Sequence, residues 1–133
     1  MKNYLKPVMK SLTNDLSAQG LAHLGDAVFE LMVRTWLCTT GTSTAKTLHN
    51  KAITFVSAKA QAEAMDRIFG KLTEDEMAIY KRGRNAHAGA VPKNSTHEEY
   101  HSATGIETLF GYLYLSGEAD RLNELFEIII KEN

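Results

Sequence analysis

The chain has 133 residues and a formal net charge of −1, from 15 Lys and Arg against 16 Asp and Glu. Apolar residues make up 44% and charged residues 23%, which is typical of a soluble globular domain and excludes a disordered tail, a collagen-like repeat and a low-complexity linker. The apolar runs are far shorter than the roughly 20 residues that span a bilayer, so we expect one domain, residues 1–133, with no membrane partner.

The first half of the chain is predicted to form two long helices. Apolar residues at spacings of three and four predict a helix over residues 16–37. The turn-forming and β-branched residues of segment 39–44 are expected to end it. A second helix is expected over residues 45–69, with room for a kink before its alanine-rich part and with Gly70 as its C-cap.

Cys38 is the single cysteine of the chain and follows Trp36 and Leu37 at the apolar end of the first predicted helix. We interpret it as a buried structural thiol rather than a nucleophile. A single cysteine cannot form an internal disulfide, and the first residues, MKNYLKP, lack the apolar stretch of a secretory signal. Both features favour a cytoplasmic location.

The second half of the chain contains two capping-box patterns. Residues 73–76, Thr-Glu-Asp-Glu, open a helix that continues through Tyr80, and residues 95–98, Ser-Thr-His-Glu, open another that continues to Leu115. A last amphipathic helix is predicted over residues 119–131. Between the two boxes, the basic stretch is expected to leave helix for an exposed loop because of its helix-breaking residues: Gly83, Gly89 and Pro92. Strand alternation is absent from the sequence, which predicts an all-α fold.

Charge is distributed unevenly along the sequence. Residues 1–97 contain 13 Lys and Arg against 8 Asp and Glu, whereas residues 98–133 contain 2 against 8. Residues 77–97 contain Lys81, Arg82, Arg84 and Lys93 and no acidic residue. The average charge therefore conceals a basic segment, which by itself is compatible with either a solvated surface or an anionic partner.

Two carboxylates lie beside glycines on predicted helices. Gly25 lies inside a helix, where glycine costs about 1 kcal/mol relative to alanine, which indicates close approach of another backbone or a ligand. Asp26 and Glu30 lie one turn apart and repel unless a cation is near. If the two helices cross at Gly25 and Gly111, Asp26 and Glu107 converge, with Glu30 as a further candidate, into an oxygen cluster suited to Mg²⁺. From spacing alone, solvated or salt-bridged carboxylates remain the alternative.

Residues 97–101, His-Glu-Glu-Tyr-His, match the H-E-x-x-H pattern of zinc peptidases. The match lies in the first turn of a predicted helix, where Glu98 is already assigned to the capping box. The sequence also offers no strand to bind a peptide substrate. We therefore interpret these residues as polar side chains at the start of a helix.

Several motifs together resemble the endonuclease domain of the ribonuclease III family. LGDAV at residues 24–28 resembles its signature helix, and ETLFGYL at residues 107–113 resembles its second acidic helix. KRGRNA at residues 81–86, followed by PKN at 92–94, is similar to the Mini-ribonuclease III branch, which lacks the double-stranded-RNA-binding domain. The resemblance covers nearly the whole chain and implies the all-α helical bundle of that endonuclease domain.

The resemblance implies a homodimeric, Mg²⁺-dependent endoribonuclease that cuts double-stranded RNA, typically in maturation of the large-subunit (23S) ribosomal RNA precursor, with Mn²⁺ as a possible substitute metal. Asp26 and Glu107 match the metal-binding carboxylates of the family, and Glu30 is a candidate for orienting a metal-bound water. Two acidic residues of full-length ribonuclease III are replaced, one by Ala22 and the other by Thr104. These departures agree with the Mini branch but leave the number of metal ions open.

Under this resemblance, the basic segment is expected to contact the RNA backbone, since A-form RNA is bound through phosphates and 2′-hydroxyls. The candidate RNA-binding residues are Lys81, Arg82, Arg84, Asn85, Lys93 and Asn94, with Lys51 and Lys59 as weaker ones. Two copies of this segment in a C₂ dimer double the phosphate contacts, and the apolar stripe that includes Phe29 is a candidate for part of the dimer contact. Ribosomal proteins are candidate accessory partners.

Two other functions remain compatible with the sequence. The first is a catalytically silent ribonuclease III-like module that binds RNA or associates with the ribosome, suggested by the residues at Ala22 and Thr104. The second is an all-α dimerisation module without an RNA partner. Mg²⁺-dependent cleavage of duplex RNA separates the enzyme from both alternatives.

Overall fold

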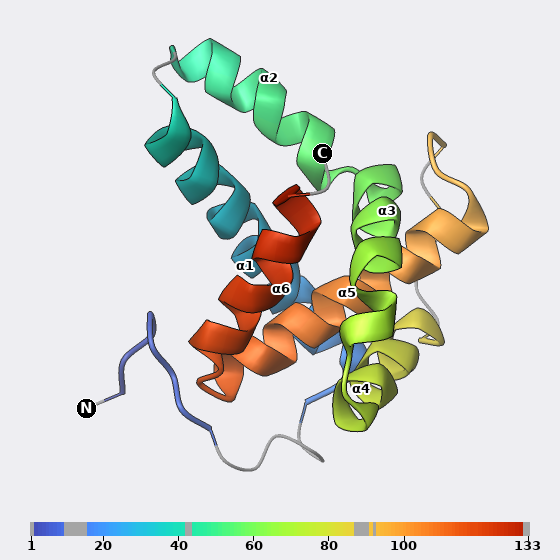
Figure 1. The fold of residues 1–133 in the computed structure, drawn as a ribbon. Coiled ribbons are helices and arrows are strands. Elements are labelled where there is room, and N and C mark those ends of the chain that lie inside the picture. Colours follow the sequence, from blue (N-terminus) through green and yellow to red (C-terminus); the bar gives the residue numbers. More distant parts are fainter. Residues whose placement is uncertain (1, 10–15, 42–43, 87–90, 92, 132–133) are drawn as a thin grey trace.

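A computed structural model describes residues 2–9, 16–41, 44–86, 91 and 93–131. Within these residues the chain forms helices and no strand, which confirms the all-α prediction (Figure 1). The elements are α1 (Ala18–Thr40), α2 (Ala45–Val56), α3 (Ala58–Ile68), the 3₁₀-helix η1 (Phe69–Lys71), α4 (Glu74–Arg84), α5 (His97–Leu115) and α6 (Ala119–Lys131).

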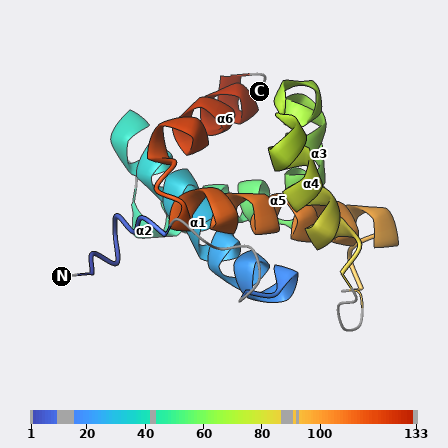
Figure 2. The ribbon, with the colours of Figure 1, turned by 90° about the horizontal axis from the view of Figure 1, so that it is seen from below.

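Helix α5 lies at the centre of the bundle and contacts α1, α3, α4 and α6. Figure 2 shows α6 and the α3–α4 segment on one side of α5, with α1 crossing it. Helix α2 packs against α1 and α3 and lies at the edge of the bundle in Figure 1. In the described part of the chain, none of the helices combines the length and apolar character needed to cross a membrane.

Helix α1 begins and ends later than the sequence predicted. Ser17 caps its start, because the Ser17 Oγ accepts a hydrogen bond of 2.9 Å from the backbone N–H of Gly20. At the other end, Thr39 and Thr40 remain helical, and their hydroxyls donate to carbonyl oxygens one turn earlier. Cys38 is exposed rather than buried, because the buried stripe of this helix runs through Val33 and Leu37 and leaves Cys38 on the solvent side.

The long helix predicted over residues 45–69 is two helices. Ser57 separates them with an extended backbone conformation, φ −66° and ψ 158°, and its Oγ accepts a hydrogen bond of 3.2 Å from the Ala60 N–H to cap α3. Gly70 does not form the predicted C-cap: α3 ends at Ile68, and Gly70 belongs to η1. The kink that the sequence allowed within this helix is therefore a complete break between α2 and α3.

Both capping boxes exist, one of them displaced by a residue. In the first, the Glu76 N–H donates to the Thr73 Oγ1 at 3.1 Å and the Thr73 N–H donates to the Glu76 Oε1 at 2.9 Å, as predicted. In the second, the pair is Thr96 and Glu99 rather than the predicted Ser95 and Glu98, so α5 begins at residue 97. Helix α6 has the predicted bounds.

The core is built around α5 and the aromatic residues that face it. Phe29 of α1, Phe110 of α5 and Phe126 of α6 meet in the interior, with ring centroids 5.4 Å apart for Phe29–Phe110 and 6.2 Å apart for Phe29–Phe126. Phe29 is 2% exposed, so it belongs to the core of the protomer rather than to a surface available for the dimer contact. Leu31, two residues further along and therefore on the opposite side of the same helix, is exposed.

A partly buried ion pair joins the start of α4 to α6. The Arg121 guanidinium donates two hydrogen bonds of 2.8 Å to the Glu76 carboxylate and a third, of 2.7 Å, to the Lys71 carbonyl oxygen. This bidentate contact holds the pKa of Glu76 below its usual value. Glu76 thus belongs both to the capping box of α4 and to the connection between α4 and α6.

Candidate active site

The centre of the candidate site is the crossing of α1 and α5, where two glycines bring the backbones together. A Cβ atom at Gly25 would lie inside the carbonyl group of Glu107 and 2.8 Å from the backbone N of Gly111. A Cβ atom at Gly111 would likewise overlap the carbonyl of Leu21 and lie 3.1 Å from the backbone N of Gly25. The predicted contact between Gly25 and Gly111 is therefore confirmed. The glycine penalty inside each helix is offset by backbone-to-backbone packing.

This crossing brings Asp26 and Glu107 together, and we call them the carboxylate pair. Burial and the neighbouring Asp26 carboxylate raise the pKa of Glu107 to about 8. A hydrogen bond between the two side chains acts in the same direction. Asp26 lies on the exposed side of the crossing and Glu107 is half-buried. Two acidic groups held side by side in this way form a site that favours a shared proton or a cation.

Gln61 of α3 is a third polar residue at this site, and the sequence analysis missed it. Its side chain is 2% exposed and acts on the Glu107 carboxyl, lowering the pKa of that group. Gln61 shares its stripe with the buried residues Ala64, Met65 and Ile68. A polar residue at an apolar position of an amphipathic helix is the sequence signal that would have identified it, since burying an unsatisfied amide costs about 1–3 kcal/mol.

The other predicted acidic candidate, Glu30, is engaged elsewhere. Its carboxylate forms an ion pair of 2.9 Å with Arg34, one turn further along α1. In the described part of the chain, no group of three or more His, Cys, Asp or Glu side chains is placed to hold a metal ion. The convergence of Glu30 with Asp26 and Glu107, which the spacing allowed, is therefore not found.

Ala22 and Thr104, which replace acidic residues of the family that the sequence resembles, are both buried. Ala22 is 7% exposed and Thr104 is 8% exposed. The Thr104 hydroxyl donates a hydrogen bond of 3.0 Å to the Tyr100 carbonyl of its own helix, so it is not available to the site. The pair consisting of Asp26 and Glu107 is thus the complete set of carboxylates at this crossing among the described residues.

The donor chemistry of the carboxylate pair fits Mg²⁺. Mg²⁺ takes oxygen ligands, keeps several of its waters and is usually held by one or two carboxylates together with substrate phosphate. Burial and the adjacent Asp26 carboxylate raise the pKa of Glu107, and a bound cation would offset both effects. Asp26 and Glu107 are the residues that would hold the ion.

The predicted RNA-binding residues divide into two groups. Lys81, Arg82, Arg84 and the C-cap residue Asn85 form the last turn of α4, which we call the basic turn. The prediction that this stretch leaves helix at Gly83 is wrong, because Gly83 packs against Thr108 and Thr104 of α5, where only a glycine fits.

The second group, Lys93 and Asn94, lies exposed in the turn before α5. The other two residues that suggested a loop, Gly89 and Pro92, lie outside the described residues. The basic turn and this second turn therefore flank the segment between α4 and α5, and neither belongs to the crossing that holds the carboxylate pair.

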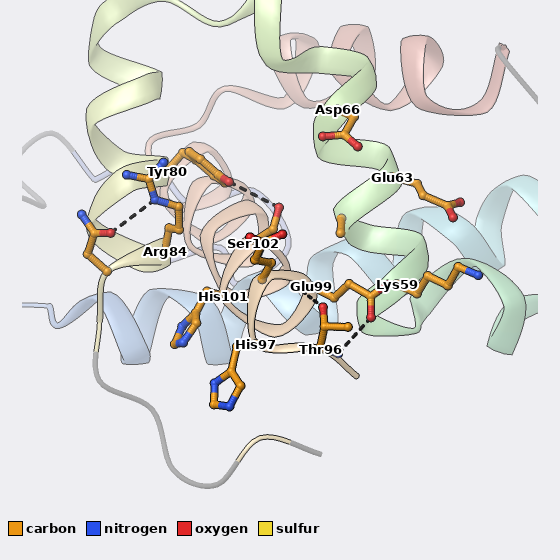
Figure 3. Close-up of a pocket in the computed structure, with 13 residues that line it drawn as sticks. Lys59, Glu63, Asp66, Tyr80, Arg84, Thr96, His97, Glu99, His101 and Ser102 are labelled. Atoms are coloured by element: carbon orange, nitrogen blue, oxygen red, sulfur yellow. Dashed lines mark hydrogen bonds between the residues drawn. The ribbon is translucent and has the colours of Figure 1, made fainter. Parts of the chain in front are cut away.

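A pocket of about 650 Å³ lies beside the basic turn, between α3, the end of α4 and the start of α5 (Figure 3). Arg84 and Asn85 line it, and the Arg84 Nε donates a hydrogen bond of 3.2 Å to the Asn85 Oδ1. The Arg84 guanidinium also lies 5.7 Å from the centre of the Tyr80 ring. Lys59 lines the α3 side. The pocket thus contains three of the predicted basic or polar candidates, but it also contains acidic residues: Glu63, Asp66, Glu98 and Glu99.

Comparison with known proteins identifies the chain's relatives. The Ribonuclease III domain family matches residues 19–118. A protein named Mini-ribonuclease 3 from Enterococcus faecalis is 42% identical over 119 residues, which are 88% of this chain and 90% of that protein. Mini-ribonuclease 3 from Brevibacillus brevis is 43% identical over 117 residues, 88% of this chain and 85% of that protein. The crystal structure of a Fusobacterium nucleatum protein gives a TM-score of 0.81 at 32% identity, covering 90% of this chain and 95% of that one.

Proposed function

Because the chain belongs to the ribonuclease III family, whose enzymes hydrolyse phosphodiester bonds in double-stranded RNA, we propose that the carboxylate pair is the catalytic centre of a Mg²⁺-dependent endoribonuclease. The observation that carries the proposal is the convergence of Asp26 and Glu107 at a crossing of two backbones. That arrangement supports a catalytic centre rather than a catalytically silent domain. Two adjacent carboxylates repel each other, and a fold without a bound ligand gains nothing by keeping them there.

In the proposed reaction, Asp26 and Glu107 would hold Mg²⁺, or Mn²⁺ in its place. The bound ion would supply an activated water and charge neutralisation for phosphodiester hydrolysis. The protein's own contribution is positional: α1 and α5 present two oxygen ligands from rigid helices, at a crossing fixed by Gly25 and Gly111. Glu30 remains a proposed water-orienting residue, for which it would have to exchange its contact with Arg34.

The proposed RNA surface consists of the basic turn together with Lys93 and Asn94. Lys81 and Arg82 are exposed on α4, and the Tyr80 ring and Asn85 hold the Arg84 side chain in place. Phosphate contacts by such residues position a duplex without reading its sequence. A homodimer presents two such surfaces, which is how a chain of 133 residues could hold a duplex firmly.

We further propose that the substrate is a double-stranded region of the large-subunit (23S) ribosomal RNA precursor, processed in the cytoplasm with ribosomal proteins as candidate partners. Residues 1–133 are proposed to act as one catalytic domain. The family membership supports both the substrate and the single domain. The RNA that accumulates uncut in cells lacking the protein would identify the substrate.

The direct test is cleavage of a labelled RNA duplex by the purified protein with and without Mg²⁺. Asp26→Asn and Glu107→Gln are each expected to lower the cleavage rate by roughly 100-fold or more, because each removes a metal ligand. Both variants are expected to keep their affinity for the duplex. Glu127→Gln, which changes an exposed carboxylate on α6, is the matched control and is expected to cleave normally.

The same assay distinguishes the alternative function. A silent RNA-binding module, suggested by the uncharged residues at Ala22 and Thr104, would bind the duplex with strong salt dependence but would show no Mg²⁺-dependent turnover. Equal cleavage by the parent protein and by Asp26→Asn would contradict the proposed catalytic centre.

A further inference from the structure

Gln61 is a buried polar side chain whose amide nitrogen the described part of the fold leaves unpaired. It is 2% exposed, and its Nε2 has no hydrogen-bond partner of normal geometry among the described residues. Its stripe on α3 is otherwise formed by Ala64, Met65 and Ile68. An amide in such a place loses its hydrogen bonds to water, so a leucine or methionine of similar size would suit the packing better.

Gln61 lies where α3 packs on α5, close enough to Glu107 to act on its carboxyl group. Among the groups that act on the Glu107 carboxyl, burial and Asp26 both favour the neutral acid, whereas the Gln61 amide favours the carboxylate. An amide N–H can only donate, and a carboxylate can only accept. The amide donor of Gln61, unpaired within the described part of the chain, and the carboxylate of Glu107 are therefore complementary hydrogen-bonding groups.

We propose that Gln61 is a positioning residue that donates a hydrogen bond from its Nε2 to the Glu107 carboxylate and thereby orients Glu107 as a metal ligand. The proposal rests on the proposed function of the carboxylate pair and adds a residue from a third helix to it. Gln61 touches neither the substrate nor the reacting atoms and acts through Glu107. The Gln61 Nε2, which has no hydrogen-bond partner among the described residues, is the donor of this hydrogen bond.

The identity of the residue suits this role. A carboxylate has about four lone-pair positions, so Glu107 can accept from Gln61 and still offer oxygen to a metal ion and to its waters. The amide is neutral and therefore adds no further negative charge beside Asp26. A glutamate at position 61 would add that charge, and a methionine or leucine would remove the donor. Hydrogen bonds to metal ligands typically change metal affinity or activity by about 10–100-fold.

The test measures binding of Mn²⁺ in the absence of RNA, by calorimetry on the full-length protein. Gln61→Met, which keeps the length of the side chain and removes the donor, is expected to weaken Mn²⁺ binding by roughly 10-fold or more. Gln61→Leu is expected to do the same and serves if the methionine variant folds poorly. Met65→Leu, one turn away in the same buried stripe, alters packing without touching the donor and is expected to bind Mn²⁺ normally.

A second readout separates positioning from general damage. The Mg²⁺ concentration for half-maximal cleavage should rise for Gln61→Met by a similar factor, while the affinity for duplex RNA in EDTA and the circular dichroism spectrum should be unchanged. Unchanged Mn²⁺ affinity in both Gln61 variants would overturn the inference. If Asp26→Asn also bound Mn²⁺ like the parent protein, the proposed metal site itself would fail, so the two failures are distinguishable.

Discussion

Glu107 must be ionised for its proposed role as a metal ligand, but its ionised form lowers the stability of the metal-free fold. Its carboxyl is half-buried beside Asp26, and both circumstances penalise its ionised form. The unfolded chain has no such penalty, so the unfolded state releases this proton at a lower pH than the folded state does. The metal-free protein is therefore less stable at pH 8 than at pH 5 through this group, and a bound divalent cation would remove the cost.

Replacement of Glu107 by glutamine is predicted to stabilise the metal-free protein as the pH rises. Because the folded-state pKa is raised to about 8, the stability difference between Glu107→Gln and the parent should be small at pH 5 and should grow towards pH 8. One pKa unit corresponds to about 1.4 kcal/mol, and a gain on the order of 1–3 kcal/mol is expected at pH 8. Thermal unfolding in EDTA at both pH values measures it.

The control for this prediction is the same measurement in excess Mn²⁺. The parent protein should gain stability from the metal ion, whereas Glu107→Gln should gain little, so the order of the two melting temperatures should approach equality or reverse. A melting-temperature difference that is the same at pH 5 and pH 8 would contradict the assignment of the shift to Glu107.

At the scale of elements, the crossing of α1 and α5 sets the geometry of the site. Helices normally lie 8–10 Å apart, with side chains between them. At Gly25 and Gly111 there is no room for a side chain, because each glycine faces the other helix's backbone. Asp26 follows one of these glycines directly, and Glu107 lies one turn before the other. The positions of both carboxylates are thus fixed by helix packing.

Gly25→Ala is predicted to be severely destabilising. The added Cβ meets the Glu107 carbonyl and the Gly111 backbone, neither of which can rotate away, so the helices must separate, at a cost of at least about 3 kcal/mol. Gly70→Ala is the matched control, since a Cβ there meets nothing within 4 Å, and it should change stability by less than about 1 kcal/mol. Urea unfolding of both variants tests the prediction, and similar midpoints would contradict it.

Particular elements show what the sequence could predict and why the remainder required the structure. Gly25 and Gly111 could be identified as a contact because glycine inside an amphipathic helix demands a reason. The capping box at Thr73 and Glu76 depends only on neighbours in sequence and was likewise predictable. In contrast, the residues around Ser57 are locally compatible with one continuous helix. The packing of α2 on α1 and of α3 on α5 determines that the helix is broken there.

The site was predictable to a similar extent. The juxtaposition of Asp26 and Glu107 followed from the two glycines, whereas Glu30 was expected nearby from its spacing and instead pairs with Arg34. The polar Gln61 in the apolar stripe of α3 could have been noticed as unusual, but the group that it meets depends on how α3 packs on α5. Local patterns therefore predict which residues are unusual, and tertiary packing determines which of them meet.

At the scale of the whole molecule, the net charge of −1 arises from charges of opposite sign that cluster at different places along the chain. The basic turn ends α4, while α6 and the start of α5 contribute acidic residues. A duplex approaching the protein therefore meets a local positive surface rather than a uniformly attractive one. Affinity should accordingly depend on a small number of phosphate contacts and fall with salt.

Removal of single charges from the basic turn is predicted to reduce the salt dependence of RNA binding. Lys81→Ala and Arg82→Ala should each weaken binding of a duplex and lower the slope of log affinity against log salt by about 1, if each side chain contacts one phosphate. Lys46→Ala, an exposed lysine on α2, should leave the slope unchanged. Fluorescence anisotropy in EDTA across a salt series measures both; an equal slope for all three variants would exclude the basic turn from the interface.

The glycine crossing finally limits how the enzyme can be controlled. Many enzymes are switched off by sliding or opening the elements that carry their reactive groups, which requires an interface with two stable packings. Backbone lies directly against backbone at Gly25 and Gly111, with no side chains between them to repack. The spacing of the carboxylates is thus a permanent property of the folded chain, and any switching of cleavage must act outside this joint, through the arrival of RNA or the supply of metal ion.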